Sequence, residues 1–137
     1  MTTVDDPACE HARRMFAADN ASRALGIEIT EMRPGYAATT MTVTDHMVNG
    51  YAITHGGYVF LLADTTFALA CNSFGQTAVA AHADIRFLRP TRAGDTLTAV
   101  ANMRNRHGRN GIYDVTVTGP DGAIAEFRGD SRVVRAG

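Results

Sequence analysis

The stretch from His55 to about Phe74, HGGYVFLLADTTFALACNSF, is the longest apolar run in the chain. It lacks the apolar–polar alternation of a strand and contains no proline, so it predicts a helix. Apolar residues occur around most of the circumference of that helix, which is typical of a helix buried on most sides. Such a helix is stable only when other elements of the chain cover it.

The flanking segments predict one more helix and a set of strands. Residues 7–20 carry apolar side chains at helical spacing, which predicts a short amphipathic helix. Residues 27–32 and 37–44 alternate apolar and polar side chains around a Pro-Gly turn, which predicts a hairpin. From Gln76 onward, stretches rich in Val, Ile, Thr and Phe predict strands joined as a meander. Turn sequences separate these stretches at residues 89–95, 106–111 and 119–122.

The order of these elements indicates the fold. Long antiparallel strands and an apolar helix bury each other when the sheet curls around the helix. We therefore predict an α+β protein with the hotdog fold, in which an antiparallel sheet wraps around a long central helix. The length of 137 residues suits one domain and is too short for two ordinary ones, so we expect a single domain over residues 1–137.

Composition and motifs argue against several functional classes. The net charge of −1 gives no positive field that would attract nucleic acid or an anionic membrane. The chain shows no signal-peptide pattern and no apolar run of the roughly 20 residues that span a membrane, so we expect a cytoplasmic protein. Cys9 and Cys71 form no CxxC pair, and His46, His82 and His107 lack metal-ligand spacing. We expect neither a metal nor a cofactor.

Asp64 is the most unusual residue of the central helix, because residues 59–63 and 67–69 around it are apolar. An unpaired buried charge costs several kcal/mol, so such a carboxylate finds partners, takes up a proton or serves a function. One interpretation is a structural Asp that bonds to a neighbouring Thr, Asn or backbone amide, with Thr65 and Thr66 as candidate partners. The other is a catalytic carboxylate, and the local sequence does not decide between them.

The sequence Thr54-His55-Gly56-Gly57 lies where this helix begins, with Thr54 as the expected N-cap. Unpaired amides and the positive end of the helix dipole converge there, and glycine lets a substrate oxygen approach the backbone closely. The segment therefore has the properties of an oxyanion hole built from backbone. The alternative is that the two glycines only allow a tight start to the helix.

Asp64 follows Gly56 by eight residues, so on a helix that rises about 1.5 Å per residue they lie about 12 Å apart along the axis. One reacting carbonyl group cannot contact both, because an acyl-transfer site needs its oxyanion donor and its base or nucleophile each within about 3 Å. If both residues are catalytic, the site combines Gly56 of one subunit with Asp64 of another. The spacing thus predicts a symmetric dimer with two equivalent sites.

The motif HGGYVFLLAD, preceded by Met47-Val48-Asn49-Gly50 and followed by ALACNSFG, closely resembles that of the phenylacetic acid degradation thioesterases, the PaaI branch of the hotdog superfamily. The resemblance runs nearly end to end and includes Phe87-Leu88-Arg89-Pro90 and the segments 93–99, 111–115 and 127–129. It implies hydrolysis of acyl-CoA thioesters, especially phenylacetyl-CoA and its ring-hydroxylated forms, by homodimers that pair into homotetramers.

The resemblance also implies roles for individual residues. Asp64 matches the family's catalytic carboxylate and Gly56 its oxyanion amide, while Asn49 and His55 match residues that position the thioester or water. Apart from the resemblance, six arginines are candidates for the phosphates of CoA, although solvated strand faces and turns explain most of them equally well: Arg86, Arg89, Arg92, Arg104, Arg106 and Arg109. The residues that we expect to contact the substrate are Gly57, Thr65, Arg89 and Arg109.

Several alternatives stay open at this point. Asp64 can act as a nucleophile that forms a mixed anhydride or as a general base on water. A hotdog hydratase or dehydratase is a rival function, although the helix lacks the His and carboxylate pair of those enzymes. A non-catalytic acyl-CoA-binding module is another, although it would not need Asp64. Relatives often place Ser or Thr early in the strand after the central helix, where this chain has Ala80-Ala81-His82-Ala83.

Overall fold

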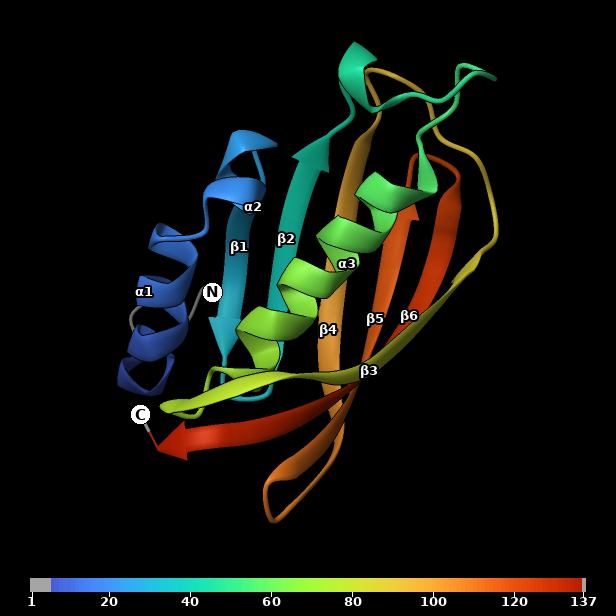
Figure 1. Cartoon of the computed structure of the whole chain (residues 1–137). Helices are drawn as coiled ribbons and strands as arrows, with labels where there is room; N and C mark the ends of the chain where they lie inside the picture. Colours follow the sequence, from blue (N-terminus) through green and yellow to red (C-terminus); the bar gives the residue numbers. More distant parts are fainter. Residues whose placement is uncertain (1–5, 137) are drawn as a thin grey trace.

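The computed structural model describes residues 6–136 (Figure 1). It begins with the short helices η1 (Pro7–Cys9), α1 (Glu10–Ala17) and α2 (Asn20–Ala24). The hairpin of β1 (Glu28–Arg33) and β2 (Tyr36–Thr42) follows, and η2 (Asp45–Met47) precedes the long helix α3 (Gly56–Cys71). Long strands then follow in sequence: β3 (Gln76–Phe87), β4 (Thr96–His107), β5 (Asn110–Gly119) and β6 (Gly122–Ala136).

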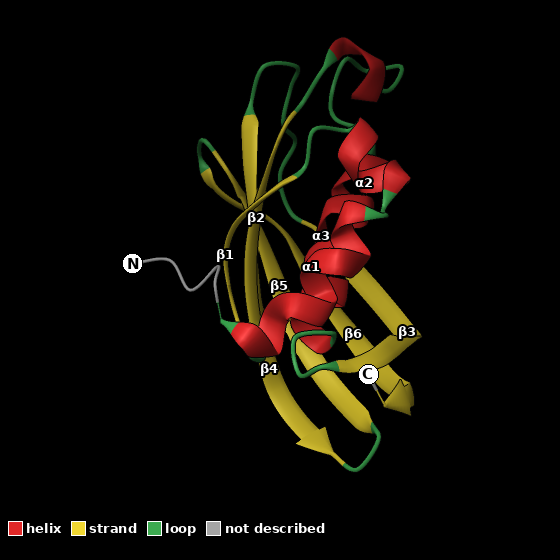
Figure 2. Cartoon of the chain, turned by 90° about the vertical axis from the view of Figure 1, so that its left-hand side faces the viewer, coloured by secondary structure: helices red, strands yellow, loops and turns green. Residues whose placement is uncertain are grey.

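Over residues 6–136 the strands form one six-stranded antiparallel sheet in the order β1-β2-β4-β5-β6-β3. The sheet curls around α3, and α1 and α2 lie on the same side of the sheet as α3 (Figures 1 and 2). This arrangement confirms the predicted hotdog fold. Within the same residues, no helix is long and apolar enough to cross a membrane.

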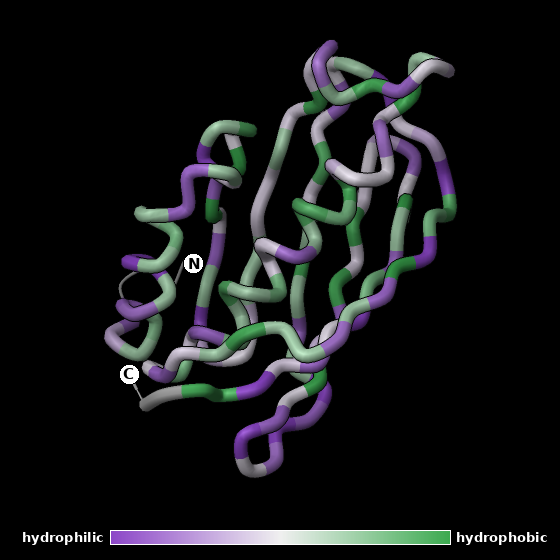
Figure 3. Tube along the Cα trace, viewed as in Figure 1, coloured by the Kyte–Doolittle hydropathy of each residue, from purple (hydrophilic) through white to green (hydrophobic). Residues whose placement is uncertain are grey.

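The hydrophobic core lies between α3 and the sheet. Phe67 of α3 is 1% exposed, and its ring centroid lies 5.7 Å from those of both Tyr113 on β5 and Phe127 on β6. This packing requires a glycine opposite, because a Cβ at Gly129 would lie 2.8 Å from the ring of Phe67. Hydrophilic residues gather instead at the β4–β5 hairpin, which projects beyond the helix (Figure 3). The predicted burial of the central helix is confirmed.

The single helix predicted over residues 7–20 is wrong. The structure has η1 and α1 up to Ala17 and a separate helix α2 that begins at Asn20. Asp19 divides them, because its carboxylate accepts a hydrogen bond from the amide of Ser22 at 2.9 Å and so caps α2. A side chain that satisfies the first amides of a new helix favours a new start over continuation of the preceding helix.

The predicted end of the central helix near Phe74 is also too late, since α3 ends at Cys71. Asn72 is 1% exposed and turns its side chain toward β3. Its Nδ2 donates to the carbonyl oxygen of Ala78 and its Oδ1 accepts from the amide of Ala78, each at 3.0 Å. The buried amide therefore joins the end of the helix to the first residues of β3.

Strand β3 lies at one edge of the sheet and pairs with β6. It is 12 residues long, and within residues 6–136 no strand pairs with its other side. A long unpaired edge presents a row of backbone donors and acceptors that another strand can bind.

Candidate active site

The loop between η2 and α3 is held in place by hydrogen bonds at both of its ends. The amide of His55 donates to the carbonyl oxygen of Met47 at 2.7 Å, and the amide of Thr54 donates to that of Thr91 at 2.8 Å. The hydroxyl groups of Thr54 and Thr91 are both buried and lie 2.7 Å apart. These contacts fix the start of α3 against the loop that follows β3.

His55 caps α3. Its Nδ1 accepts a hydrogen bond from the amide of Gly57 at 2.9 Å. The prediction that Thr54 is the N-cap is wrong, because the Thr54 hydroxyl is bonded to Thr91 instead. An Nδ1 that accepts a hydrogen bond leaves the proton of a neutral imidazole on Nε2. His55 is exposed and therefore presents an N–H group to its surroundings at the helix start.

The cap leaves one amide of the first turn without an acceptor. The amide of Gly57 is bonded to His55 Nδ1, and that of Tyr58 donates to the His55 carbonyl oxygen at 3.0 Å. The amide of Gly56 has no acceptor among residues 6–136. It lies at the positive end of the helix dipole. Gly56 thus offers an N–H group to an incoming oxygen, which is what an oxyanion donor requires.

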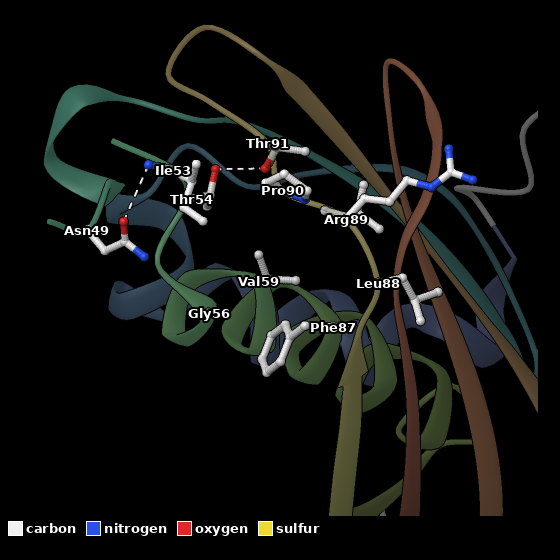
Figure 4. Close-up of a pocket in the computed structure, with 11 residues that line it drawn as sticks. Asn49, Ile53, Thr54, Gly56, Val59, Phe87, Leu88, Arg89, Pro90 and Thr91 are labelled. Atoms are coloured by element: carbon white, nitrogen blue, oxygen red, sulfur yellow. Dashed lines mark hydrogen bonds between the residues drawn. The ribbon is translucent and has the colours of Figure 1, made fainter. Parts of the chain in front are cut away.

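Asn49 borders the same cavity as Gly56. Its Oδ1 accepts from the amides of Tyr51 at 2.9 Å and Ile53 at 3.3 Å, which holds the loop in a tight turn where Ala52 has a φ of 61°. Because Oδ1 already accepts from the backbone, Nδ2 is the part of the amide left to bind a ligand. Figure 4 shows Nδ2 turned toward the cavity. Asn49 and Gly56 therefore present two hydrogen-bond donors at one cavity.

A cavity of about 420 Å³ opens at the N-terminal end of α3. Its apolar wall consists of Ile53, Val59, Phe87, Leu88 and Ile124, and Arg89 stands beside it (Figure 4). The volume is in the range of sites that bind small organic ligands. The apolar wall and the two donors fit a ligand with a polar carbonyl group and a hydrophobic body.

Asp64 lies on α3 outside this cavity and is half-buried. Within residues 6–136 no hydrogen bond or ion pair reaches its carboxylate. Burial raises the pKa of Asp64, and the negative charge of Asp19 raises it further. The hydroxyls of Thr65 and Thr66 are bonded elsewhere, to Ser22 and Thr39 at 2.7 Å each. The interpretation of Asp64 as a structural carboxylate held by these threonines is therefore wrong.

The family follows from comparison with known proteins. A model described as the thioesterase superfamily matches residues 51–126, more than half of the chain. The acyl-coenzyme A thioesterase PaaI of Escherichia coli is 48% identical over 125 residues, which cover 90% of this chain and 89% of that protein. The chain belongs to the thioesterase superfamily.

Solved structures agree with the fold of this thioesterase. The E. coli PaaI protein from the phenylacetic acid degradation operon superposes with a TM-score of 0.91 at 46% identity, with 94% of each chain covered. A hypothetical thioesterase of Streptococcus pneumoniae, solved with coenzyme A, has a TM-score of 0.77 at 27% identity. That match covers 80% of this chain and 90% of the other.

The four residues expected at the substrate lie in different parts of the thioesterase. Arg89 borders the cavity, and its guanidinium points away from the cavity and donates to the carbonyl oxygen of Asp121 (Figure 4). The amide of Gly57 is already bonded to His55, and Thr65 is 7% exposed with its hydroxyl bonded to Ser22. Arg109 stands at the β4–β5 hairpin, at the end of the molecule opposite the start of α3 (Figure 1). Arg89 is the member of this set that the fold brings to the cavity of the same subunit.

Sequence reasoning missed several residues that shape the site. Phe87 presses its ring against Gly56, and Thr91 anchors the loop before α3. Asp19 and Ser22 reach the region of Asp64 from the N-terminal helices. A local signal existed for Asp19 alone, because Asp is one of the residues preferred at a helix N-cap. Within the described residues, no three His, Cys, Asp or Glu side chains gather to hold a metal ion.

Proposed function

We propose that this protein hydrolyses acyl-CoA thioesters to the free acid and CoA, with phenylacetyl-CoA or its ring-hydroxylated forms as the substrate. The observation that carries the proposal is the amide of Gly56 at the mouth of an apolar cavity, on the same helix as the carboxylate of Asp64, since neither group has a hydrogen-bond partner within residues 6–136. The names of the PaaI relative and of the S. pneumoniae thioesterase with coenzyme A support CoA as the leaving group. The phenylacetyl group follows from the operon of the E. coli relative.

The catalytic site is shared between two subunits. Gly56 and Asp64 are about 12 Å apart along one helix, and the cavity at Gly56 does not include Asp64. The free edge of β3 supports a dimer in which two β3 strands pair antiparallel, so that each α3 start approaches the middle of the partner's helix. One amide and one carboxylate from different subunits then complete each of two sites.

Exposed apolar side chains support this assembly. Val79 on β3 is 48% exposed and Leu88 just after it is 54% exposed. Phe60 and Leu61, on the stretch of α3 before Asp64, are only partly buried. A second subunit that covers these side chains would gain hydrophobic stabilisation. We further propose that such dimers pair into homotetramers in the cytoplasm.

Asp64 acts as an ionised carboxylate in either of two routes. As a nucleophile, an oxygen of Asp64 bonds to the thioester carbon, the C–S bond breaks, and CoA leaves as a thiolate that takes a proton from water. Water then hydrolyses the mixed anhydride and restores Asp64. As a general base, Asp64 removes a proton from the attacking water, and that proton passes to the departing thiolate. In both routes Gly56 N–H and Asn49 Nδ2 bind the oxyanion, and His55 holds the amide of Gly57.

Arg89 is the residue of this subunit placed to bind a CoA phosphate, because it stands beside the cavity. Arg109 can serve the same site only from another subunit, because it lies at the far end of its own sheet.

The decisive experiment measures CoA release with a thiol reagent across aryl and fatty acyl-CoAs. Wild-type protein should release CoA most efficiently from phenylacetyl-CoA or a hydroxylated analogue. Asp64→Asn should lose at least about 100-fold in kcat, because it removes a nucleophile or base without changing side-chain size. Asp45→Asn removes an exposed carboxylate in η2 and should leave the rate unchanged. Binding without release by the wild type would instead indicate an acyl-CoA-binding module and overturn the proposal.

A further inference from the structure

Asp19 and Ser22 connect the N-terminal helices to the part of α3 that carries Asp64. The Asp19 carboxylate accepts from the Ser22 amide at 2.9 Å through Oδ1 and from the Ser22 hydroxyl at 2.6 Å through Oδ2. Ser22 is 1% exposed, and its Oγ lies 2.7 Å from Oγ1 of Thr65. An ionised carboxylate only accepts, so Ser22 donates to Asp19 and Thr65 donates to Ser22. A chain of hydrogen bonds thus runs from Asp19 to the residue next to Asp64.

This series of hydrogen bonds keeps the carboxylate of Asp19 within electrostatic range of the carboxylate of Asp64. The negative charge of Asp19 raises the pKa of Asp64. Within residues 6–136 neither carboxylate forms an ion pair. The other ionisable side chains on α1 and α2, which pack against α3, form no bond to Asp64: Glu10, His11, Arg13, Arg14 and Arg23.

The other described ionisable group that interacts with Asp64 is Cys71, and its thiol carries no charge near neutral pH. Cys71 lies two turns farther along α3, and Tyr113 of β5 interacts with Cys71 in turn. Burial raises the pKa of the Cys71 thiol to about 12 and that of the Tyr113 hydroxyl to about 12. Asp19 is therefore the charged group of the described chain that acts on Asp64. A like charge beside a half-buried carboxylate is unfavourable for folding, which makes this pair a candidate for a functional arrangement.

We propose that Asp19 is a positioning residue that fixes α2 against α3 through Ser22 and Thr65 and holds a negative charge within electrostatic range of Asp64, making Asp64 a stronger base or nucleophile. The inference rests on the catalytic role of Asp64 given under the proposed function. A nearby negative charge disfavours the ionised form of a carboxyl group, so the carboxylate binds a proton and attacks an electrophile more strongly. Activity should consequently begin at a higher pH than an isolated Asp would allow.

The test removes the negative charge at position 19 and keeps the N-cap of α2. Asp19→Asn retains an oxygen for the Ser22 amide, because Asn and Asp are both good N-caps. The acid limb of the kcat/KM profile against pH should move to lower pH by about 0.3–1 unit. Asp19→Ser also keeps a capping oxygen and should move the limb in the same direction. Glu126→Gln is the matched control, because Glu126 is exposed on β6 and accepts from Thr116 through an oxygen that Gln retains.

A second measurement needs no substrate. Carbon-13 NMR can follow the titration of the Asp64 carboxyl group in wild-type and Asp19→Asn protein, and the midpoint should fall in the variant. If wild-type protein hydrolyses thioesters and Asp64→Asn does not, but neither the limb nor the midpoint moves, the role of Asp19 is overturned while the proposed function stands. If no thioester is hydrolysed, the proposed function fails, and the NMR midpoint still reports whether Asp19 acts on Asp64.

Discussion

The ring of Phe87 lies against the α-carbon of Gly56, so a Cβ at Gly56 would approach Cζ of Phe87 to 3.0 Å and Cε1 to 3.2 Å (Figure 4). Gly56→Ala keeps the backbone amide but crowds this ring and displaces it within the cavity. We expect kcat/KM to fall about tenfold, which corresponds to about 1.4 kcal/mol of crowding and misalignment. Adding Phe87→Leu to Gly56→Ala should recover part of that loss. A double variant no better than Gly56→Ala would show that the ring is not the cause.

Gly56→Pro provides the sharpest test of the free amide. Gly56 is the first residue of α3, a position where proline is well accepted, and its N–H is the group that proline lacks. His55 before it has φ −63° and ψ 133°, which a following proline allows. We expect a folded protein whose kcat is at least about 100-fold below that of Gly56→Ala, since the Ala variant shares the crowding and keeps the donor.

The shared site predicts complementation between two inactive variants. Heterodimers of Gly56→Pro and Asp64→Asn subunits should regain activity, because one of their two sites has an intact Gly56 and an intact Asp64. Each purified homodimer should stay inactive under the same assay. Verified heterodimers with no activity would contradict a site divided between subunits.

The cap formed by His55 predicts that the free energy of unfolding depends on the capping hydrogen bond and not only on the size of the side chain at position 55. His55→Ala leaves the amide of Gly57 without its acceptor and should lower the free energy of unfolding by about 1 kcal/mol. His55→Asn supplies a good capping oxygen and should lose much less. Urea unfolding of the three proteins compares these values directly. Equal losses in both variants would indicate that contacts other than the cap are responsible.

The raised pKa of Asp64 predicts that the carboxylate weakens the fold at neutral pH. Burial, followed by the charge of Asp19, raises the pKa in the folded state above that of the unfolded chain. The folded state therefore holds the Asp64 proton more tightly, and the free energy of unfolding falls as pH rises through the range between the two pKa values. Above that range the loss is complete. Asp64→Asn, which does not titrate, should be more stable than wild type at pH 7.

Urea unfolding at several pH values checks this prediction. The advantage of Asp64→Asn should grow as the pH is raised above about 4, the ordinary pKa of Asp, and should level off above the raised pKa of the folded state. Asp45→Asn, at an exposed position, should show no such trend. A variant less stable than wild type at pH 7 would mean that a favourable partner holds the ionised Asp64.

Local patterns were sufficient to predict the main elements. The helix α3 follows from a long apolar run, and the strands follow from alternation and turn sequences that neighbouring residues define. The prediction failed where the start of a helix depended on which hydrogen bond one polar side chain forms. Asp19 starts a new helix, and Thr54 gives up the cap of α3 because its hydroxyl meets Thr91, 37 residues away in sequence.

The sequence by itself determined the fold class and the separation of Gly56 from Asp64, because the apolar pattern selects the helix and the rise per residue is constant. Only the tertiary structure decided that His55 occupies the amide of Gly57 and leaves that of Gly56 free, that Phe87 closes over Gly56, and that Asp19 reaches the region of Asp64. The contacts of Phe87 and Asp19 join segments distant in sequence, and His55 forms the cap because the distant Thr91 holds the Thr54 hydroxyl. They depend on how the sheet, the loops and the N-terminal helices pack around α3, which no local pattern of residues specifies.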